Sequence, residues 1–164
     1  MKPISYYIAV SGCIALIVLG VYLSNWTYYD YLWKMDAARV LLSNMQSTSN
    51  LNSLESDIKA TKTVLPEDGN PVWLFPTEDT DFRLIQGDLQ TMLQTANNIA
   101  EVSPNDNTFH SGILNIQAQA TVITFNLLNA ESVVWVSPLF LLANSVWIVG
   151  VAGMWKLAPR YRKL

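Results

Sequence analysis

Two long stretches without a charged residue constrain this chain more than any other feature. Residues 4–23 are 20 consecutive uncharged and mostly apolar positions, and residues 133–155 are a second run of 23. A transmembrane helix needs about 20 apolar residues to cross a hydrocarbon core of roughly 30 Å. Both runs are long enough, so we expect one transmembrane helix in each.

Aromatic residues flank both runs. Trp and Tyr prefer the level of the lipid headgroups, because their rings are apolar while their N–H and O–H groups favour water. The residues that we expect to anchor the two helices at the membrane interface are Trp26, Tyr28, Tyr29, Trp135 and Trp155.

The distribution of charge predicts the orientation in the membrane. Residues 24–132 contain all 13 acidic residues of the chain but only five cations, a net charge of −8. The terminal segments carry the other five cations and no carboxylate side chain. Because Lys and Arg are retained on the cytoplasmic side, we expect both termini in the cytoplasm, 156–164 as a basic cytoplasmic tail, and 24–132 as an extracytoplasmic domain. The expected location is a cell membrane or an organellar inner membrane.

The first run has two alternative interpretations, and both fit less well. A cleaved signal peptide has a shorter apolar core followed by a small-residue cleavage site, which this run lacks. The residues before Cys13 resemble a lipoprotein processing box, but the ten residues after Cys13 are almost wholly apolar, where a mature lipoprotein begins with a polar tether. A membrane-spanning helix remains the expectation.

The segment between the runs has four successive apolar stripes with alternating spacings of three and four residues. They begin at Tyr28, Leu51, Phe82 and Phe109. This spacing predicts four helices packed at about 20° to one another. The fold class that we expect is an all-α membrane protein, in which two transmembrane helices extend into an extracytoplasmic antiparallel four-helix bundle.

Turn-forming residues divide these helices. A Ser/Thr/Asn cluster at 46–52 offers N-cap candidates, the segment 66–80 contains three prolines, and Ser103-Pro104 predicts another helix start. Nothing between the apolar runs and the flanking stripes breaks the helical pattern, and the first stripe extends backward through Val21 and Ile14. The predicted helices therefore cover about 5–47, 49–65, 78–102 and 104–156.

Two groups of residues are candidates for docking other proteins. Val72, Trp73, Leu74 and Phe75 are four consecutive apolar residues in a polar loop, and they need a burial partner. This partner is either a neighbouring subunit or the outer lipid interface, or the loop folds back and plugs the bundle.

In the second run, Asn144 is strongly polar, while Gly150 and Gly153 permit close backbone approach. They predict docking to another membrane subunit, unless the two spans simply pack on each other.

The sequence offers little for catalysis. The one histidine, His110, and the one cysteine, Cys13, cannot build a zinc site together, and no P-loop, Gly-x-Ser-x-Gly or dinucleotide-binding motif occurs. Carboxylates near 67–81 do not follow a calcium-loop pattern. We therefore expect no catalytic residues, no metal and no cofactor. The pI near 5.0 argues against nucleic-acid partners.

These features favour a non-catalytic accessory subunit of a larger integral-membrane complex, such as a respiratory or membrane-oxygenase assembly. The expected partners are other membrane-protein subunits and the lipid bilayer, and a homo-oligomer is also open. The alternative is an extracytoplasmic sensing module, because the layout resembles the ligand-binding half of a bacterial chemoreceptor. That resemblance covers topology only, and a sensor of this kind would need a partner chain to carry the signal.

Overall fold

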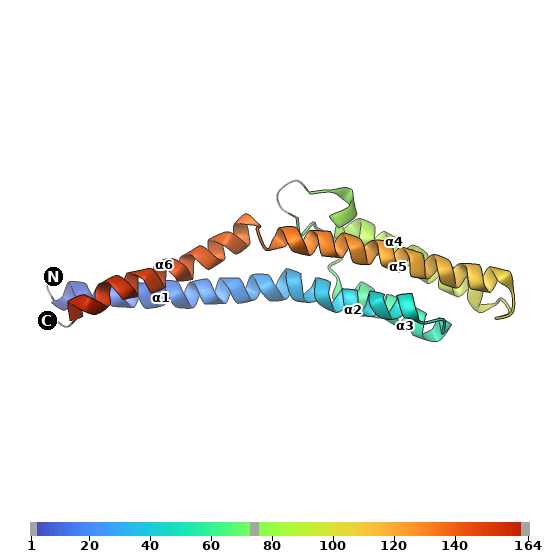
Figure 1. The fold of residues 1–164 in the computed structure, drawn as a ribbon, viewed down its shortest axis with the longest axis horizontal. Coiled ribbons are helices and arrows are strands. Elements are labelled where there is room, and N and C mark those ends of the chain that lie inside the picture. Colours follow the sequence, from blue (N-terminus) through green and yellow to red (C-terminus); the bar gives the residue numbers. More distant parts are fainter. Residues whose placement is uncertain (1–2, 73–75, 162–164) are drawn as a thin grey trace. The chain divides into compact units, whose positions relative to one another are not determined.

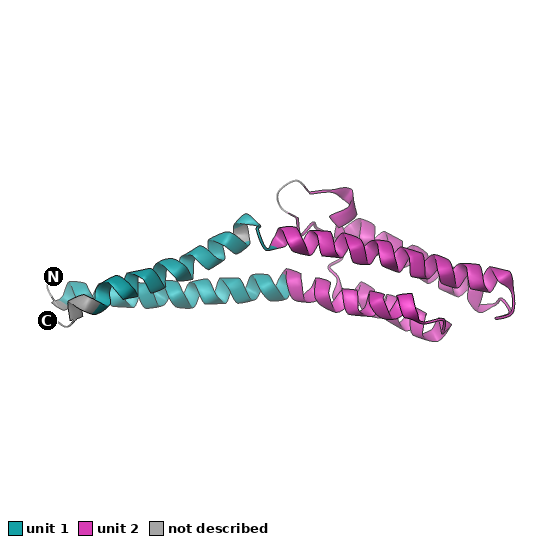
Figure 2. Cartoon of the chain, in the orientation of Figure 1, with its two compact units in different colours: residues 1–30, 135–164 teal, residues 31–134 magenta. Residues whose placement is uncertain are grey.

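The computed structural model describes residues 3–72 and 76–161, and every regular element in those ranges is helical (Figure 1). The chain forms two compact units (Figure 2). Unit 1 comprises residues 1–30 and 135–164, and unit 2 comprises residues 31–134.

Unit 1 is a pair of helices that lie side by side, α1 (Pro3–Thr27) and α6 (Pro138–Tyr161). Two helices of the chain are long and apolar enough to cross a membrane, Ile4–Ser47 and Phe140–Ala158. Their apolar side chains point mostly outward, since only 6% and 17% of the two apolar windows are buried. The expected pair of span-length helices is therefore present.

The first long helix contains a wide turn that the sequence pattern did not predict. After α1, a π-helix, η1 (Tyr28–Leu32), continues the helical backbone into α2 (Trp33–Ser47). A π turn holds more residues than an α turn because its hydrogen bonds join residues five apart. The buried Thr27 is accordingly followed by the buried Leu32, five residues later. The predicted continuous helix over about 5–47 is confirmed, since the helical backbone runs from Pro3 to Ser47. Tyr28, Val21 and Ile14 are exposed, so they do not continue the buried face of α2.

Unit 2 contains α2, α3 (Leu51–Val64), the 3₁₀ turn η2 (Glu78–Thr80), α4 (Phe82–Ala100) and α5 (Asn107–Val134). Helix α2 contacts α3 and α5, and α4 contacts the same two helices. The predicted stripes supply the core of this unit. Its fully buried large side chains are Met35, Leu42, Met45, Leu54, Ile58, Phe82, Ile85, Leu89, Met92, Ile116, Ile123 and Leu127.

Side chains cap the starts of these helices. Asn50 Oδ1 accepts hydrogen bonds from the backbone N–H groups of Asn52 and Ser53, at 3.0 and 3.2 Å, so the predicted cap of α3 is confirmed. The predicted start of the last helix at Ser103-Pro104 is wrong. Helix α5 begins three residues later, where Asp106 Oδ1 accepts a 2.7 Å hydrogen bond from the N–H of Thr108.

The predicted continuous helix over 104–156 is also wrong, because residues 135–137 separate α5 from α6. Pro138 explains the break. Its ring has no N–H to continue a helical ladder, and it disfavours the α conformation at the preceding residue. Ser137 instead starts α6: its carbonyl accepts from the N–H of Leu141 at 2.9 Å, and its hydroxyl accepts from the N–H of Phe140 at 3.3 Å.

Candidate functional site

Three glycines lie in the contact between α1 and α6. An ideal Cβ on Gly20 would lie 2.5 Å from the backbone N of Trp147, and one on Gly150 would lie 2.9 Å from the carbonyl O of Cys13. A Cβ on Gly153 would lie 2.6 Å from Cys13 Sγ. Gly150 and Gly153 thus pack within the chain, which matches the alternative in which the two spans contact each other. That they dock a partner stays a prediction.

Asn144 also finds its hydrogen-bond partners within unit 1. Its Nδ2 donates to the carbonyl O of Phe140 at 2.8 Å, and its Oδ1 accepts from Trp147 Nε1 at 3.1 Å. Ser24 Oγ on α1 lies 3.5 Å from the same Oδ1. These bonds give the amide group of Asn144 partners without a second chain. Docking through Asn144 stays a prediction.

The aromatic residues expected at the interface are exposed. Trp26, Tyr28, Tyr29, Trp135 and Trp155 all present at least two fifths of their surface. Three of them contact a neighbouring ring edge to face, since Tyr28 and Tyr29 pack on each other and Trp135 packs on Phe140, with centroids 5.5 and 4.9 Å apart. That they anchor the helices at a membrane interface stays a prediction.

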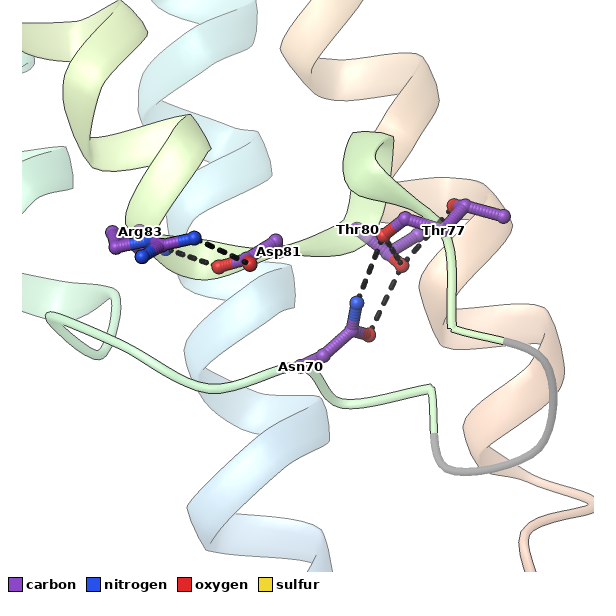
Figure 3. A network of polar contacts seen from close by, with 5 residues as sticks. All are labelled: Asn70, Thr77, Thr80, Asp81 and Arg83. Atoms are coloured by element: carbon purple, nitrogen blue, oxygen red, sulfur yellow. Dashed lines mark hydrogen bonds and ion pairs between the residues drawn. The ribbon is translucent and has the colours of Figure 1, made fainter.

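Asn70 joins the two stems of the loop that follows α3 (Figure 3). Its Nδ2 donates to the carbonyl O of Thr77 at 2.9 Å, and its Oδ1 accepts from Thr80 Oγ1 at 3.0 Å. The same Oδ1 accepts from the N–H of Val72 at 2.9 Å. Gly69 adopts a φ of 92°, which only glycine reaches easily, and its carbonyl accepts from the N–H of Phe82. Both stems are therefore fixed to the helices beside them.

The apolar loop residues predicted to dock a partner fall on and next to this network. Val72 is only 6% exposed, so it packs against unit 2 itself. Trp73, Leu74 and Phe75 lie outside the described residues. Docking by this loop stays a prediction.

Sequence reasoning missed Asn70 and also Gln86, which closes the end of α3. Gln86 Nε2 lies within hydrogen-bonding distance of the carbonyl groups of Lys62, Leu65 and Pro66, at 2.9, 3.1 and 3.2 Å. The last carbonyls of a helix have no partner within the helix, and a side chain from α4 supplies one here. The sequence carries no signal for these contacts, because they join residues 20 to 24 positions apart.

One ion pair joins α2 to α5. Arg39 Nη1 donates to Glu131 Oε2 at 2.6 Å and lies 3.6 Å from Asp36 Oδ1. The side chains of Arg39 and Glu131 are about a quarter exposed. Polar bonds from Gln46 to Thr124 and from Gln117 to the carbonyl of Thr48 join the same two helices, both at 3.0 Å.

Within residues 3–72 and 76–161, no group of three or more His, Cys, Asp or Glu side chains could hold a metal ion. His110 is exposed and packs edge to face on Phe109.

The chain matches no protein-family model, no curated protein and no solved structure. Unit 1 has a shallow groove along α1, called the α1 groove here. It is lined by Ser11, Ile14, Ala15, Val18, Leu19 and Tyr22.

Proposed function

We propose that this protein is a non-catalytic accessory subunit of a larger integral-membrane complex. The α1 groove carries this proposal. It lies on the side of α1 opposite Cys13 and Gly20, which contact α6. Its small residues Ser11 and Ala15, together with the neighbouring Gly12, which has open space around it, permit the close approach that drives helix association in lipid.

We also propose that unit 2 is an antiparallel four-helix bundle that lies outside the membrane. The ring of contacts among α2, α3, α4 and α5 supports an antiparallel four-helix bundle. The net charge of −8 over residues 24–132, against cations alone in the terminal segments, supports a bundle outside the membrane and cytoplasmic termini. Its partners are other membrane-protein subunits, and we assign it no catalytic residue and no cofactor.

The first test is to solubilise the native membrane gently and to measure the mass of the particle that contains this chain. A stoichiometric assembly with other membrane proteins is the expected result, and a particle of one or two copies would refute the proposal.

Ala15→Phe fills the α1 groove and is expected to release the chain from the assembly. Ser5→Phe adds the same ring at an exposed α1 position that lies off the face lined by the groove residues, so it should leave the assembly intact.

The loop is tested separately. If it anchors a partner, Trp73→Ala combined with Phe75→Ala should weaken association while the thermal unfolding midpoint stays unchanged. A lower midpoint with normal association would instead indicate that the loop plugs the bundle.

A sensing module is the second candidate, and one observation favours it. The helical backbone is continuous from Pro3 to Ser47, through α1, η1 and α2, so a movement in unit 2 has a direct covalent and hydrogen-bonded route into α1. A free particle that binds a small molecule through unit 2 would support this candidate over the first.

A further inference from the structure

The close contacts of unit 1 fix how its two antiparallel helices are aligned along each other (Figure 2). Gly153 of α6 lies against Cys13 of α1, since an ideal Cβ on the glycine would lie 2.6 Å from the Sγ atom. Both helices rise by about 1.5 Å per residue, so Lys156, three residues beyond Gly153, lies at about the level of Val10. The uncharged run of α1 begins at residue 4. Lys156 is therefore level with apolar residues of α1, about six residues or roughly 9 Å inside the start of that run.

The surface at this end of unit 1 is both cationic and apolar. Lys156 is exposed, whereas the next residue, Leu157, is buried. Trp155 is 80% exposed, and at the start of α1 Ile4 and Ile8 are 72% and 67% exposed. A phospholipid has the complementary combination, an acyl chain joined to a phosphate.

The chain provides no anion for this cation. In the part of the chain that the structure describes, Lys156 forms no ion pair. Residues 1–29 and 133–164 contain five cations but no Asp or Glu, so no acidic side chain of these segments competes for the ammonium group. A cation next to hydrocarbon is costly unless it pairs with an anion or reaches the lipid headgroups.

We propose that Lys156 binds the phosphate of an anionic phospholipid. This inference depends on the proposed placement of unit 1 in a membrane and goes beyond the accessory-subunit role. A lysine stem extends along apolar surface while its ammonium group reaches the headgroups, and Trp155 beside it has the preference of Trp for that level. An acidic side chain of another protein would itself have to lie level with an apolar run, where charged residues are rare.

The charge of the terminal segments selects an anionic lipid over a zwitterionic one. Their five cations, unbalanced by any acidic side chain, attract a headgroup that bears a net negative charge. A zwitterionic headgroup carries its own cation next to the phosphate, which offsets this attraction. Each Lys or Arg near a membrane surface adds to the binding of anionic lipids, so the contribution of Lys156 can be measured separately.

Lipid retention by the full chain in a mild detergent tests this proposal. Phosphatidylglycerol, phosphatidylcholine or inorganic phosphate is added, and native mass spectrometry counts the molecules that stay bound. We expect the chain to retain phosphatidylglycerol in preference to phosphatidylcholine. Lys156→Gln should weaken the binding of phosphatidylglycerol about fivefold, the effect of one cation near an anionic surface, whereas Lys156→Arg should preserve it.

Lys59→Gln is the matched control, because it removes one positive charge from an exposed position of α3 in unit 2. It should leave lipid retention unchanged, and circular dichroism verifies the fold of every variant. Equal retention of both lipids, equal losses in Lys156→Gln and Lys59→Gln, or displacement of phosphatidylglycerol by an equal concentration of inorganic phosphate would overturn the proposal.

The isolated assembly distinguishes a protein partner from a lipid. If Lys156→Gln releases a co-purifying protein and leaves lipid retention unchanged, Lys156 pairs with that protein and the lipid proposal is wrong. A chain that prefers phosphatidylglycerol through Lys156 but forms no larger assembly would keep this inference and refute the accessory-subunit proposal. A chain that forms the assembly without any lipid preference would do the reverse.

Discussion

At the scale of single residues, the helix caps of unit 2 are the most directly testable feature. Asn50→Ala removes the side chain that accepts from the N–H groups of Asn52 and Ser53, and loss of such a cap costs about 1 kcal/mol. We expect that decrease in the free energy of unfolding, measured by urea titration of the detergent-solubilised chain. Asn52→Ala is the control, since it keeps the backbone bond and alters only an exposed side chain. Equal losses in both variants would contradict the capping role.

The cap at Asp106 adds a dependence on pH. Hydrogen bonds from the backbone and side chain of Thr108 lower the pKa of Asp106 below its ordinary value of 3.8. The stabilisation is therefore present above that value and is lost as the pH falls through the lowered pKa. Asp106→Asn retains a cap but does not titrate, so wild type should lose thermal stability relative to it only in acid. Burial raises the pKa of Asp57. This opposite effect is the same in wild type and in Asp106→Asn, so it cancels in the difference between their stabilities.

At the scale of elements, the glycines of α1 provide a matched pair. A Cβ on Gly20 would collide with the backbone of Trp147, whereas a Cβ on Gly12 meets nothing within 4 Å. Gly20→Ala is therefore expected to destabilise the contact between α1 and α6 by about 1–3 kcal/mol, the usual cost of overpacking, and Gly12→Ala should not. The measurement is the thermal unfolding midpoint in a mild detergent. A similar midpoint for both variants would show that the close contact does not matter for stability.

The helices and their buried faces could be predicted from the sequence because apolar periodicity is a local signal. The stripes of α3 and α4 lie where the spacing put them, and residues such as Leu54 and Leu89 are fully buried. The π turn could not be predicted this way, since Tyr28 continues the spacing of three and four and only tertiary contacts select Leu32 instead. Pro138 is a local signal for the break before α6. The uncharged run over 133–155 is long enough to span a membrane without a break, so the run by itself predicts one continuous helix. Bonds such as Gln86 to the end of α3 depend on packing between distant segments.

At the scale of the whole molecule, the uneven charge makes a prediction about topology. If residues 24–132 lie outside, a thiol at Ser56→Cys should react with a membrane-impermeant maleimide on intact cells, in the Cys13→Ala background. A thiol at Lys163→Cys in the basic tail should react only after permeabilisation. Labelling of the tail on intact cells would show that the cations do not set the orientation as the positive-inside rule requires.

The two connections between unit 1 and unit 2 differ in mechanical character. On one side, helical backbone bonds run without interruption from α1 through η1 into α2, while on the other side residues 135–137 interrupt the ladder between α5 and α6. The first connection is therefore helical throughout, and the second is not. Turning α2 about its axis against α1 would break helical backbone hydrogen bonds at η1, whereas residues 135–137 form no helix that a turn of α5 would have to break.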